Sequence, residues 1–142
     1  MTQSATAHWE TELVLDADDQ ELIAIATELI SRRGDGVDHT VAAAARDATG
    51  TIHTGVNLHH FTGGPCAEVV AIAVAVSSSS EPLTTIVAVG DRGRGVLSPC
   101  GRCRQIMADY FPELRVIVPG EHAVPVAELL PFAYTWPDRQ EP

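Results

Sequence analysis

Residues 97–105 read Leu97-Ser98-Pro99-Cys100-Gly101-Arg102-Cys103-Arg104-Gln105, so two thiols stand three positions apart directly behind a proline. Proline is tolerated at the start of a helix, because its missing N–H would have no partner there. The spacing therefore predicts that Cys100 and Cys103 share one face of the first turn of a helix. Two sulfurs on one face can both reach a tetrahedral zinc ion, at a Zn–S distance of about 2.3 Å. This stretch is predicted to be half of a metal site.

The third cysteine of the chain stands in a similar setting. Cys66 follows Pro65 and opens an apolar run with helical character. A helix N-terminus favours the thiolate, which is the form that binds a metal. Three protein ligands would leave a tetrahedral zinc ion with one open position, as in catalytic sites, and water is expected to fill it. Zinc can lower the pKa of such a water to about 7.

Glu68 lies two residues after Cys66. On an ideal helix the two side chains point about 200° apart, so Glu68 is not expected to coordinate the same metal. At a first turn it can approach the bound water from the side, as a general acid/base would. A Cys-x-Glu and a Pro-Cys-x-x-Cys, each opening a helix, match the signature of zinc-dependent nucleobase deaminases. The alternatives are a structural zinc site completed by His59 or His60, or buried thiols without a metal.

Composition and length bound the remaining possibilities. The 142 residues are 45% hydrophobic and 20% charged, which predicts one globular domain over residues 1–142. Residues 1–15 lack periodicity and are expected to be flexible or draped over the surface. We expect a cytoplasmic protein without membrane contact, because no apolar run or leader indicates otherwise and three cysteines cannot all pair.

The charge pattern argues against nucleic acid as a partner. The net charge is −10, whereas a nucleic-acid binder needs a basic surface to neutralise phosphates. Four arginines nevertheless gather around the Cys-x-x-Cys: Arg92, Arg94, Arg102 and Arg104. Three thiolates around one Zn²⁺ carry a net negative charge, which nearby arginines could offset. The alternative is that these arginines form a solvated face.

Hydrophobic periodicity predicts the order of the secondary structure elements. A first helix is expected to begin with N-cap and first-turn acids at residues 16–19 and to run to Arg33. Further helices are expected over 67–76 and 100–110, with a short one over 125–130. Strands are expected over 40–45, 52–57, 84–89 and 114–118, the first two as an antiparallel hairpin. Strands that alternate with helices after an initial hairpin predict a three-layer α/β/α domain with a mixed central sheet.

Beyond the motif, the chain resembles the small zinc-dependent cytidine deaminase family. Over about residues 38–136 it is most similar to the blasticidin-S deaminases of that family. The resemblance rests on Thr54–Asn57, His60–Glu68, Arg94–Gln105, Glu128–Pro131, Tyr134 and Trp136.

The resemblance implies a cytidine deaminase-like fold and a hydrolytic deaminase that converts a cytosine nucleoside, or a nucleoside antibiotic such as blasticidin S, to the uracil form. It implies that Cys66, Cys100 and Cys103 bind one zinc ion per subunit. Glu68 would then relay protons from water to the ring nitrogen and the leaving amine. A homotetramer whose sites take residues from neighbouring subunits is also implied.

The resemblance implies further contacts with the substrate. The backbone around Ala67 would hold the ring carbonyl, the Ser98 carbonyl would accept a hydrogen bond from the exocyclic amine, and Asn57 would face the sugar. Tyr134 and Trp136 are candidates for substrate contact or for packing between subunits.

Three positions depart from the family pattern. His59 stands where ordinary cytidine deaminases of this size carry a glutamate that holds a ribose hydroxyl. His39 stands where an aromatic residue is expected to stack on the pyrimidine. Val69 follows Glu68 where an arginine is frequent, so Arg94 or Arg102 would supply the compensating charge. These departures leave open a pocket for another free, modified or purine-like base, and a zinc-stabilised binding protein without catalysis is a further alternative.

Overall fold

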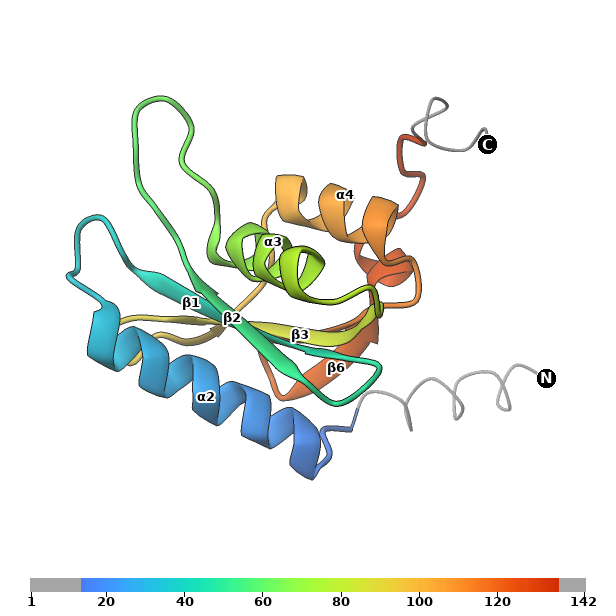
Figure 1. The fold of residues 1–142 in the computed structure, drawn as a ribbon, viewed down its shortest axis with the longest axis horizontal. Helices are drawn as coiled ribbons and strands as arrows, with labels where there is room; N and C mark the ends of the chain where they lie inside the picture. Colours follow the sequence, from blue (N-terminus) through green and yellow to red (C-terminus); the bar gives the residue numbers. More distant parts are fainter. Residues whose placement is uncertain (1–13, 136–142) are drawn as a thin grey trace.

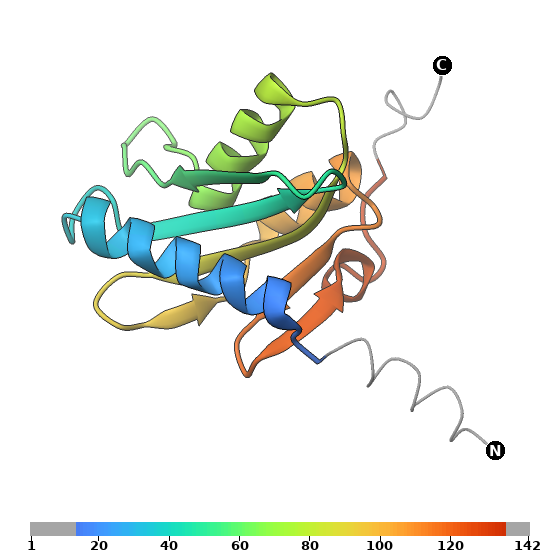
Figure 2. The ribbon, with the colours of Figure 1, turned by 60° about the horizontal axis from the view of Figure 1, so that its bottom comes forward.

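A mixed sheet lies between two layers of helices in the computed structural model, which describes residues 14–135 (Figure 1). Helix α2 (Ala17–Arg33) covers one face of the sheet. Helices α3 (Ala67–Ser78) and α4 (Gly101–Tyr110) lie on the opposite face, as Figures 1 and 2 show. The predicted three-layer α/β/α architecture is confirmed.

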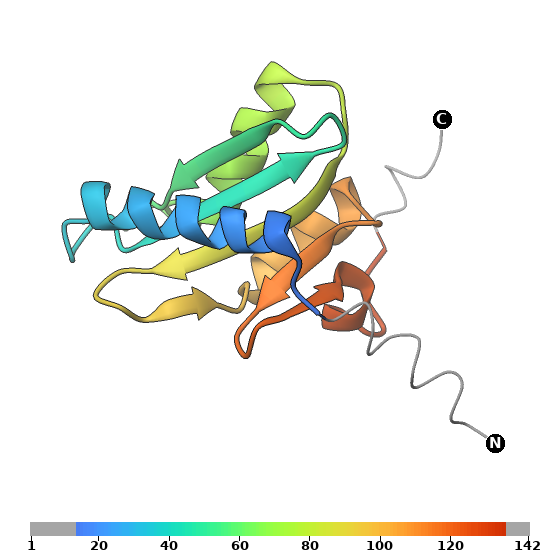
Figure 3. The same cartoon turned by 90° about the horizontal axis from the view of Figure 1, so that it is seen from below.

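The sheet has the strand order β2-β1-β3-β5-β6, and β4 pairs with β3 beside this path (Figure 3). Only β3 and β5 are parallel, while every other pair is antiparallel. The strands are β1 (Val41–Asp47), β2 (Ile52–Val56), β3 (Leu83–Gly90), β4 (Gly95–Leu97), β5 (Arg115–Val118) and β6 (His122–Pro125). The sheet is therefore mixed, as predicted.

Helix α2 begins with a capping box at Asp16. The side chain of Asp16 accepts a hydrogen bond from the backbone N–H of Asp19, and the Asp19 carboxylate accepts one from the N–H of Asp16. Asp19 is buried and forms two 3.1 Å hydrogen bonds with the guanidinium of Arg115 on β5. This pair attaches the start of α2 to the sheet.

Strand β1 brings the helices of both layers close to the sheet. Its four alanines, residues 42–45, are fully buried. Ala42 and Ala44 pack on the α2 side, whereas Ala43 and Ala45 pack on the side of α3 and α4. On β2, a Cβ added to Gly55 would stand 2.6 Å from the backbone nitrogen of Ala71, so α3 rests almost directly on the strand.

The structure differs from the sequence prediction at short elements. Strands β4 and β6 were not predicted, and α3 continues through Ser78 where a loop was expected from Ser77. The predicted last helix is a 3₁₀ turn, Val126–Leu129. Val14 forms an isolated bridge with His122, while residues 1–13 lie outside the described part. In residues 14–135 no helix combines the length and apolar character needed to cross a membrane.

Candidate active site

Two of the three cysteines occupy the same position in different helices. Cys66 is the N-cap of α3 and Cys100 is the N-cap of α4, both with extended backbone. Pro99 lies directly before the N-cap of α4, next to the predicted helix start at residue 100. Proline restricts the preceding residue to extended conformations, so it suits the strand-to-helix connection just as well. Cys103 lies one turn into α4, where it is fully buried.

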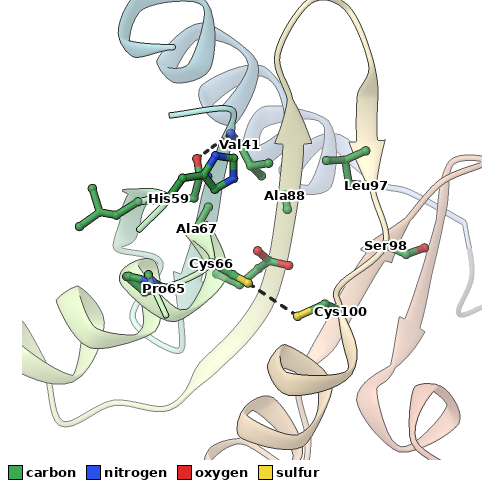
Figure 4. A pocket seen from close by; sticks show the side chains of 13 residues that line it. Val41, His59, Pro65, Cys66, Ala67, Ala88, Leu97, Ser98 and Cys100 are labelled. Carbon is green, nitrogen blue, oxygen red and sulfur yellow. Dashed lines mark hydrogen bonds between the residues drawn. The ribbon is translucent and has the colours of Figure 1, made fainter. Parts of the chain in front are cut away.

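The three sulfurs converge at the N-termini of α3 and α4. Figure 4 shows two of them, those of Cys66 and Cys100, facing each other. The sulfurs of Cys66 and Cys100 are 3.6 Å apart, and all three sulfurs lie within 4.8 Å of one another. Four ligands at 2.3 Å around a tetrahedral zinc would lie about 3.8 Å apart. The donor set and its spacing therefore fit a zinc ion.

The surroundings act differently on the three thiols. Burial raises the pKa of Cys66 and, with the nearby Glu68 carboxylate, that of Cys103. Burial would also raise the pKa of Cys100, but the backbone N–H of Cys103 and the neighbouring thiols lower it. Three thiols this close cannot all ionise without a compensating cation, so the cluster is built for a metal.

Glu68 is buried in the first turn of α3, next to the sulfurs. Burial raises the pKa of its carboxyl, against opposing hydrogen bonds from its own backbone N–H and from Cys103. A carboxyl beside the sulfur cluster, with its pKa raised above the ordinary value, has the position that a general acid/base requires.

A pocket opens beside Cys66, Glu68 and Cys100, and Figure 4 shows its lining. It is enclosed by residues of β1 and β3, the loop that follows β2, the start of α3, and the end of β4 with the segment that leads to α4. The lining residues are Val41, Asn57, Leu58, His59, Gly64, Pro65, Cys66, Ala67, Glu68, Ala88, Leu97, Ser98 and Cys100. Most of this surface is apolar, with a few polar groups near the cysteines, as is typical of sites for small molecules.

Ala67 and Ser98 approach the pocket from opposite sides. Ala67 is the first residue of α3, so its backbone N–H has no partner within the helix. Ser98 lines the pocket, and its side chain points away from the cysteines in Figure 4. The backbone contacts that the resemblance implies for Ala67 and Ser98 stay predictions.

Comparison with known proteins identifies the family of the chain. Residues 16–118 match the family model described as the cytidine and deoxycytidylate deaminase zinc-binding region. The chain belongs to this family. Membership makes it a deaminase of cytosine-type substrates with a zinc-binding region.

Relatives and solved structures agree with this assignment. Blasticidin-S deaminase of Bacillus cereus is 37% identical over 129 residues, which cover 82% of this chain and 92% of that protein. Cytidine deaminase of Halalkalibacterium halodurans is 33% identical over 108 residues, or 71% of this chain and 81% of that protein. The cytidine deaminase structure from Mycobacterium tuberculosis has a TM-score of 0.74 at 29% identity, and the match covers 85% of this chain and all of that one.

Asn57 is held by the backbone of β1 in this deaminase. Its Oδ1 accepts hydrogen bonds from the N–H groups of Thr40 (2.7 Å) and Val41 (2.9 Å), and its Nδ2 donates to the Thr40 hydroxyl (3.2 Å). One N–H of the amide then remains to donate to a ligand. Sequence reasoning missed this attachment, because no local pattern links residues 40 and 57.

Of the two histidines that depart from the family pattern, one lines the pocket and the other does not. His59 lines the pocket, and its Nδ1 is 2.6 Å from the carbonyl oxygen of Val37. Because a carbonyl only accepts, Nδ1 carries the proton and Nε2 is left to meet a ligand. His39 is not among the lining residues, and its Nδ1 donates to the Asn57 carbonyl at 2.8 Å. The pocket therefore takes in His59 but not His39.

The arginines of the Cys-x-x-Cys region are spread over several contacts. Arg94 binds Asp91 and the Thr40 carbonyl, and Arg102 is exposed on the first turn of α4. Arg104 donates from Nε to the Pro99 carbonyl (2.8 Å) and from Nη1 to the Leu129 carbonyl (3.1 Å). Arg104 thus fastens the segment that carries Cys100, a role that its spacing in the sequence does not reveal.

Tyr134 is not among the residues that line the pocket. Tyr134 is 70% exposed, and its carbonyl accepts a hydrogen bond from the side chain of Gln105 on α4. Trp136 lies outside the described residues.

Proposed function

We propose that this protein is a zinc-dependent hydrolase that deaminates a cytosine nucleoside, or a nucleoside antibiotic of the blasticidin S type, with release of ammonia. One observation carries the proposal: three thiols and a buried carboxyl meet at one end of an apolar pocket, at the N-termini of two helices. The resemblance to Bacillus cereus blasticidin-S deaminase supports the antibiotic as a substrate class.

In this proposal Cys66, Cys100 and Cys103 hold the zinc ion. Zinc, when bound, is a Lewis acid that makes a hydroxide nucleophile available near neutral pH. The N-terminal dipoles of α3 and α4 favour the thiolate ligands. Arg94 and Arg102 remain candidates for offsetting their charge, and Arg104 keeps the Cys100 segment in place.

Glu68 moves the protons. It takes one from the attacking water and delivers it to the ring nitrogen, and it then assists transfer of a proton to the departing amine. The carbon–nitrogen bond to the exocyclic amine breaks, a carbon–oxygen bond forms, and ammonia and the 4-oxo ring are the products. Burial of Glu68 excludes bulk water from this exchange.

The pocket walls position the ring and the sugar. The free N–H of Ala67 is placed to bind the ring carbonyl, and the Ser98 carbonyl to accept from the exocyclic amine. Asn57 offers one N–H to the sugar, and His59 adds a ring nitrogen at the same wall. His39 does not line the pocket but holds Asn57 by donating a hydrogen bond to its carbonyl.

We also propose a cytoplasmic homotetramer with shared sites. Exposed apolar side chains flank the pocket and α3, which supports burial between subunits: Leu58, Phe61, Val74 and Val76. Tyr134 and Trp136 are candidates to complete the site of a neighbouring subunit. The clustered free thiols favour a reducing compartment.

The test follows the loss of the cytosine absorbance band on incubation with cytidine, deoxycytidine and blasticidin S. Turnover of one of them by the wild type, and a loss of about 10²- to 10⁴-fold in kcat for Glu68→Gln with zinc content retained, would support the proposal. No change with any of the three would contradict it. Ammonia release from another aminated base would then point to a remodelled pocket, whereas no release from any amine would favour a binding protein.

A further inference from the structure

A surface guanidinium is connected by hydrogen bonds to the wall of the pocket. Arg94 lies in the turn between β3 and β4, and its Nη2 donates to the carbonyl of Thr40 and to Oδ1 of Asp91, each at 2.8 Å. Its Nε also donates to Oδ1 of Asp91, at 3.1 Å. The backbone N–H of Asp91 donates to the same Thr40 carbonyl at 2.9 Å. The arginine thus holds Thr40 and Asp91 together.

The backbone leaves room for this guanidinium. A Cβ added to Gly90, at the end of β3, would stand 2.9 Å from both Cζ and Nε of Arg94. No side chain could occupy position 90 while Arg94 keeps its place. Glycine at this position therefore lets the arginine lie across the strand end.

Thr40, whose carbonyl Arg94 holds, is in turn hydrogen-bonded to the Asn57 side chain. The Thr40 N–H and hydroxyl both bind the Asn57 side chain, and the Val41 N–H takes the second lone pair of its Oδ1. Asn57 is 4% exposed and lines the pocket. The direction of its remaining N–H is therefore set by the position of residues 40 and 41.

The positive charge of Arg94 is largely neutralised by the adjacent Asp91 carboxylate. The Asp91 carboxylate that it binds is nearly buried, with a 2.8 Å contact to Nη2. A cation paired this closely with an anion contributes little net field at a distance. Arg94 is therefore better suited to hold a backbone segment than to offset the charge of thiolates.

We infer that Arg94 is a positioning residue, which acts through Thr40 on Asn57 and thereby sets the affinity for the sugar-bearing part of the substrate. This inference rests on the proposed function, because it takes the Asn57 wall as the sugar site. It predicts a change in KM rather than in kcat, since the Glu68 chemistry and the zinc site are left intact.

The chain provides a matched control on the same turn. Arg92 has the same charge, but its Nη2 donates to the Gly36 carbonyl at 3.0 Å and does not contact Thr40. Its Nε also forms a 3.5 Å ion pair with Oδ2 of Asp91, the oxygen that Arg94 does not bind. Arg92→Gln therefore removes the same charge but leaves the hydrogen bonds from Arg94 to the Thr40 carbonyl and to Oδ1 of Asp91 in place.

The experiment measures zinc content, KM and kcat for the wild type, Arg94→Gln, Arg94→Lys and Arg92→Gln, together with backbone amide hydrogen exchange at Thr40 and Val41. Arg94→Gln is expected to raise KM about three- to tenfold with kcat and zinc unchanged, and to speed exchange of both amides. Arg94→Lys is expected to recover only part of the KM, because an ammonium cannot bridge two acceptors as a planar fork does. Arg92→Gln is expected to match the wild type.

Two results would overturn the inference. The first is loss of zinc and of kcat at unchanged KM in Arg94→Gln, which would make Arg94 a counter-charge. The second is equal amide exchange in Arg94→Gln and Arg92→Gln. If Arg94→Gln fails to fold, Thr40→Val removes the hydroxyl that binds Asn57 and must raise KM in the same way. A wild type without turnover would contradict the proposed function, while amide exchange would still decide the link between Arg94 and Asn57.

Discussion

The sulfur atoms of Cys66 and Cys100 lie 3.6 Å apart, although 34 positions separate the two residues in the sequence. Each begins a different helix on the same face of the sheet, so the sheet and not the local chain sets this distance. It is close to the separation of about 3.8 Å expected for two ligands of one tetrahedral zinc. The folded chain therefore presents the ligands already assembled.

Removal of zinc should lower the thermal stability of the fold. Without the metal, three thiols and a buried carboxyl crowd one site, and the binding free energy of the metal is lost from the folded state. We expect dialysis against a chelator to lower the melting temperature by about 5 °C or more, as followed by circular dichroism. Addition of Zn²⁺ should restore it and Ca²⁺ should not, because thiolates are poor ligands for calcium. An unchanged melting temperature would contradict a zinc site at these cysteines.

Replacement of Gly55 by alanine should displace α3. The added Cβ would stand 2.6 Å from the Ala71 nitrogen and 2.7 Å from a methyl carbon of Val70, which forces the helix away from β2. We expect Gly55→Ala to lower the free energy of unfolding by about 1–3 kcal/mol, measured by urea denaturation, and to reduce kcat because α3 carries Cys66 and Glu68.

Gly101 provides the matched control for that substitution. It is the first residue of α4, and a Cβ there would meet nothing within 4 Å. Gly101→Ala should leave stability unchanged or raise it by up to about 1 kcal/mol, because alanine is the better helix former. Equal losses in Gly55→Ala and Gly101→Ala would show that close packing of α3 is not the cause.

The pH dependence of stability should contain a contribution from Asp47. Hydrogen bonds from the Thr49 hydroxyl, from His53 and from the N–H groups of Thr49 and Thr51 hold the pKa of this buried carboxyl well below its usual range. The unfolded chain, with an Asp pKa of about 3.9, then binds the proton first as the pH falls. The stability that Asp47 contributes is therefore fully present above about pH 4 and is lost progressively at lower pH.

Urea unfolding at pH 7, 5, 4 and 3 tests this expectation. The difference in stability between the wild type and Asp47→Asn should be constant between pH 7 and 5 and should shrink toward pH 3. The exposed residue Glu28 on α2 provides the control, since Glu28→Gln changes the net charge equally. A difference that stays constant down to pH 3 would mean that Asp47 titrates normally in the folded state.

Substrate preference should respond to position 59. His59 lines the pocket, and its Nδ1 is engaged by the Val37 carbonyl. It stands at the position where the family resemblance predicts a glutamate that holds a ribose hydroxyl. We expect His59→Glu to lower the KM for cytidine relative to that for blasticidin S by about tenfold, because a carboxylate is the stronger acceptor for a hydroxyl. His60→Gln in the same loop serves as the control. A ratio of KM values that is the same in both variants would remove position 59 from substrate selection.

The sequence predicts the residues of the site more completely than the strands of the sheet that supports it. Residue type and spacing are enough to predict Cys66, Glu68 and the Cys-x-x-Cys as site residues. The structure brings them together. Strand β4 has three residues and β6 has four, too short for an alternating pattern, and their places depend on pairing with β3 and β5. The bonds from Thr40 to Asn57 and from Arg94 to Thr40 join residues 17 and 54 positions apart, so only the folded chain reveals them.

The buried alanines of strand β1 tolerate fewer substitutions than the loops around the pocket. At Ala42, Ala43, Ala44 and Ala45 almost every substitution enlarges a fully buried side chain, and helices press on both faces of the strand. Overpacking of this kind costs about 1–3 kcal/mol, against a total stability of about 5–15 kcal/mol for a domain. Amino-acid substitutions that the fold tolerates at these four positions are therefore confined to glycine, serine or cysteine. Changes that adapt the pocket to a new substrate must come from the loops around it.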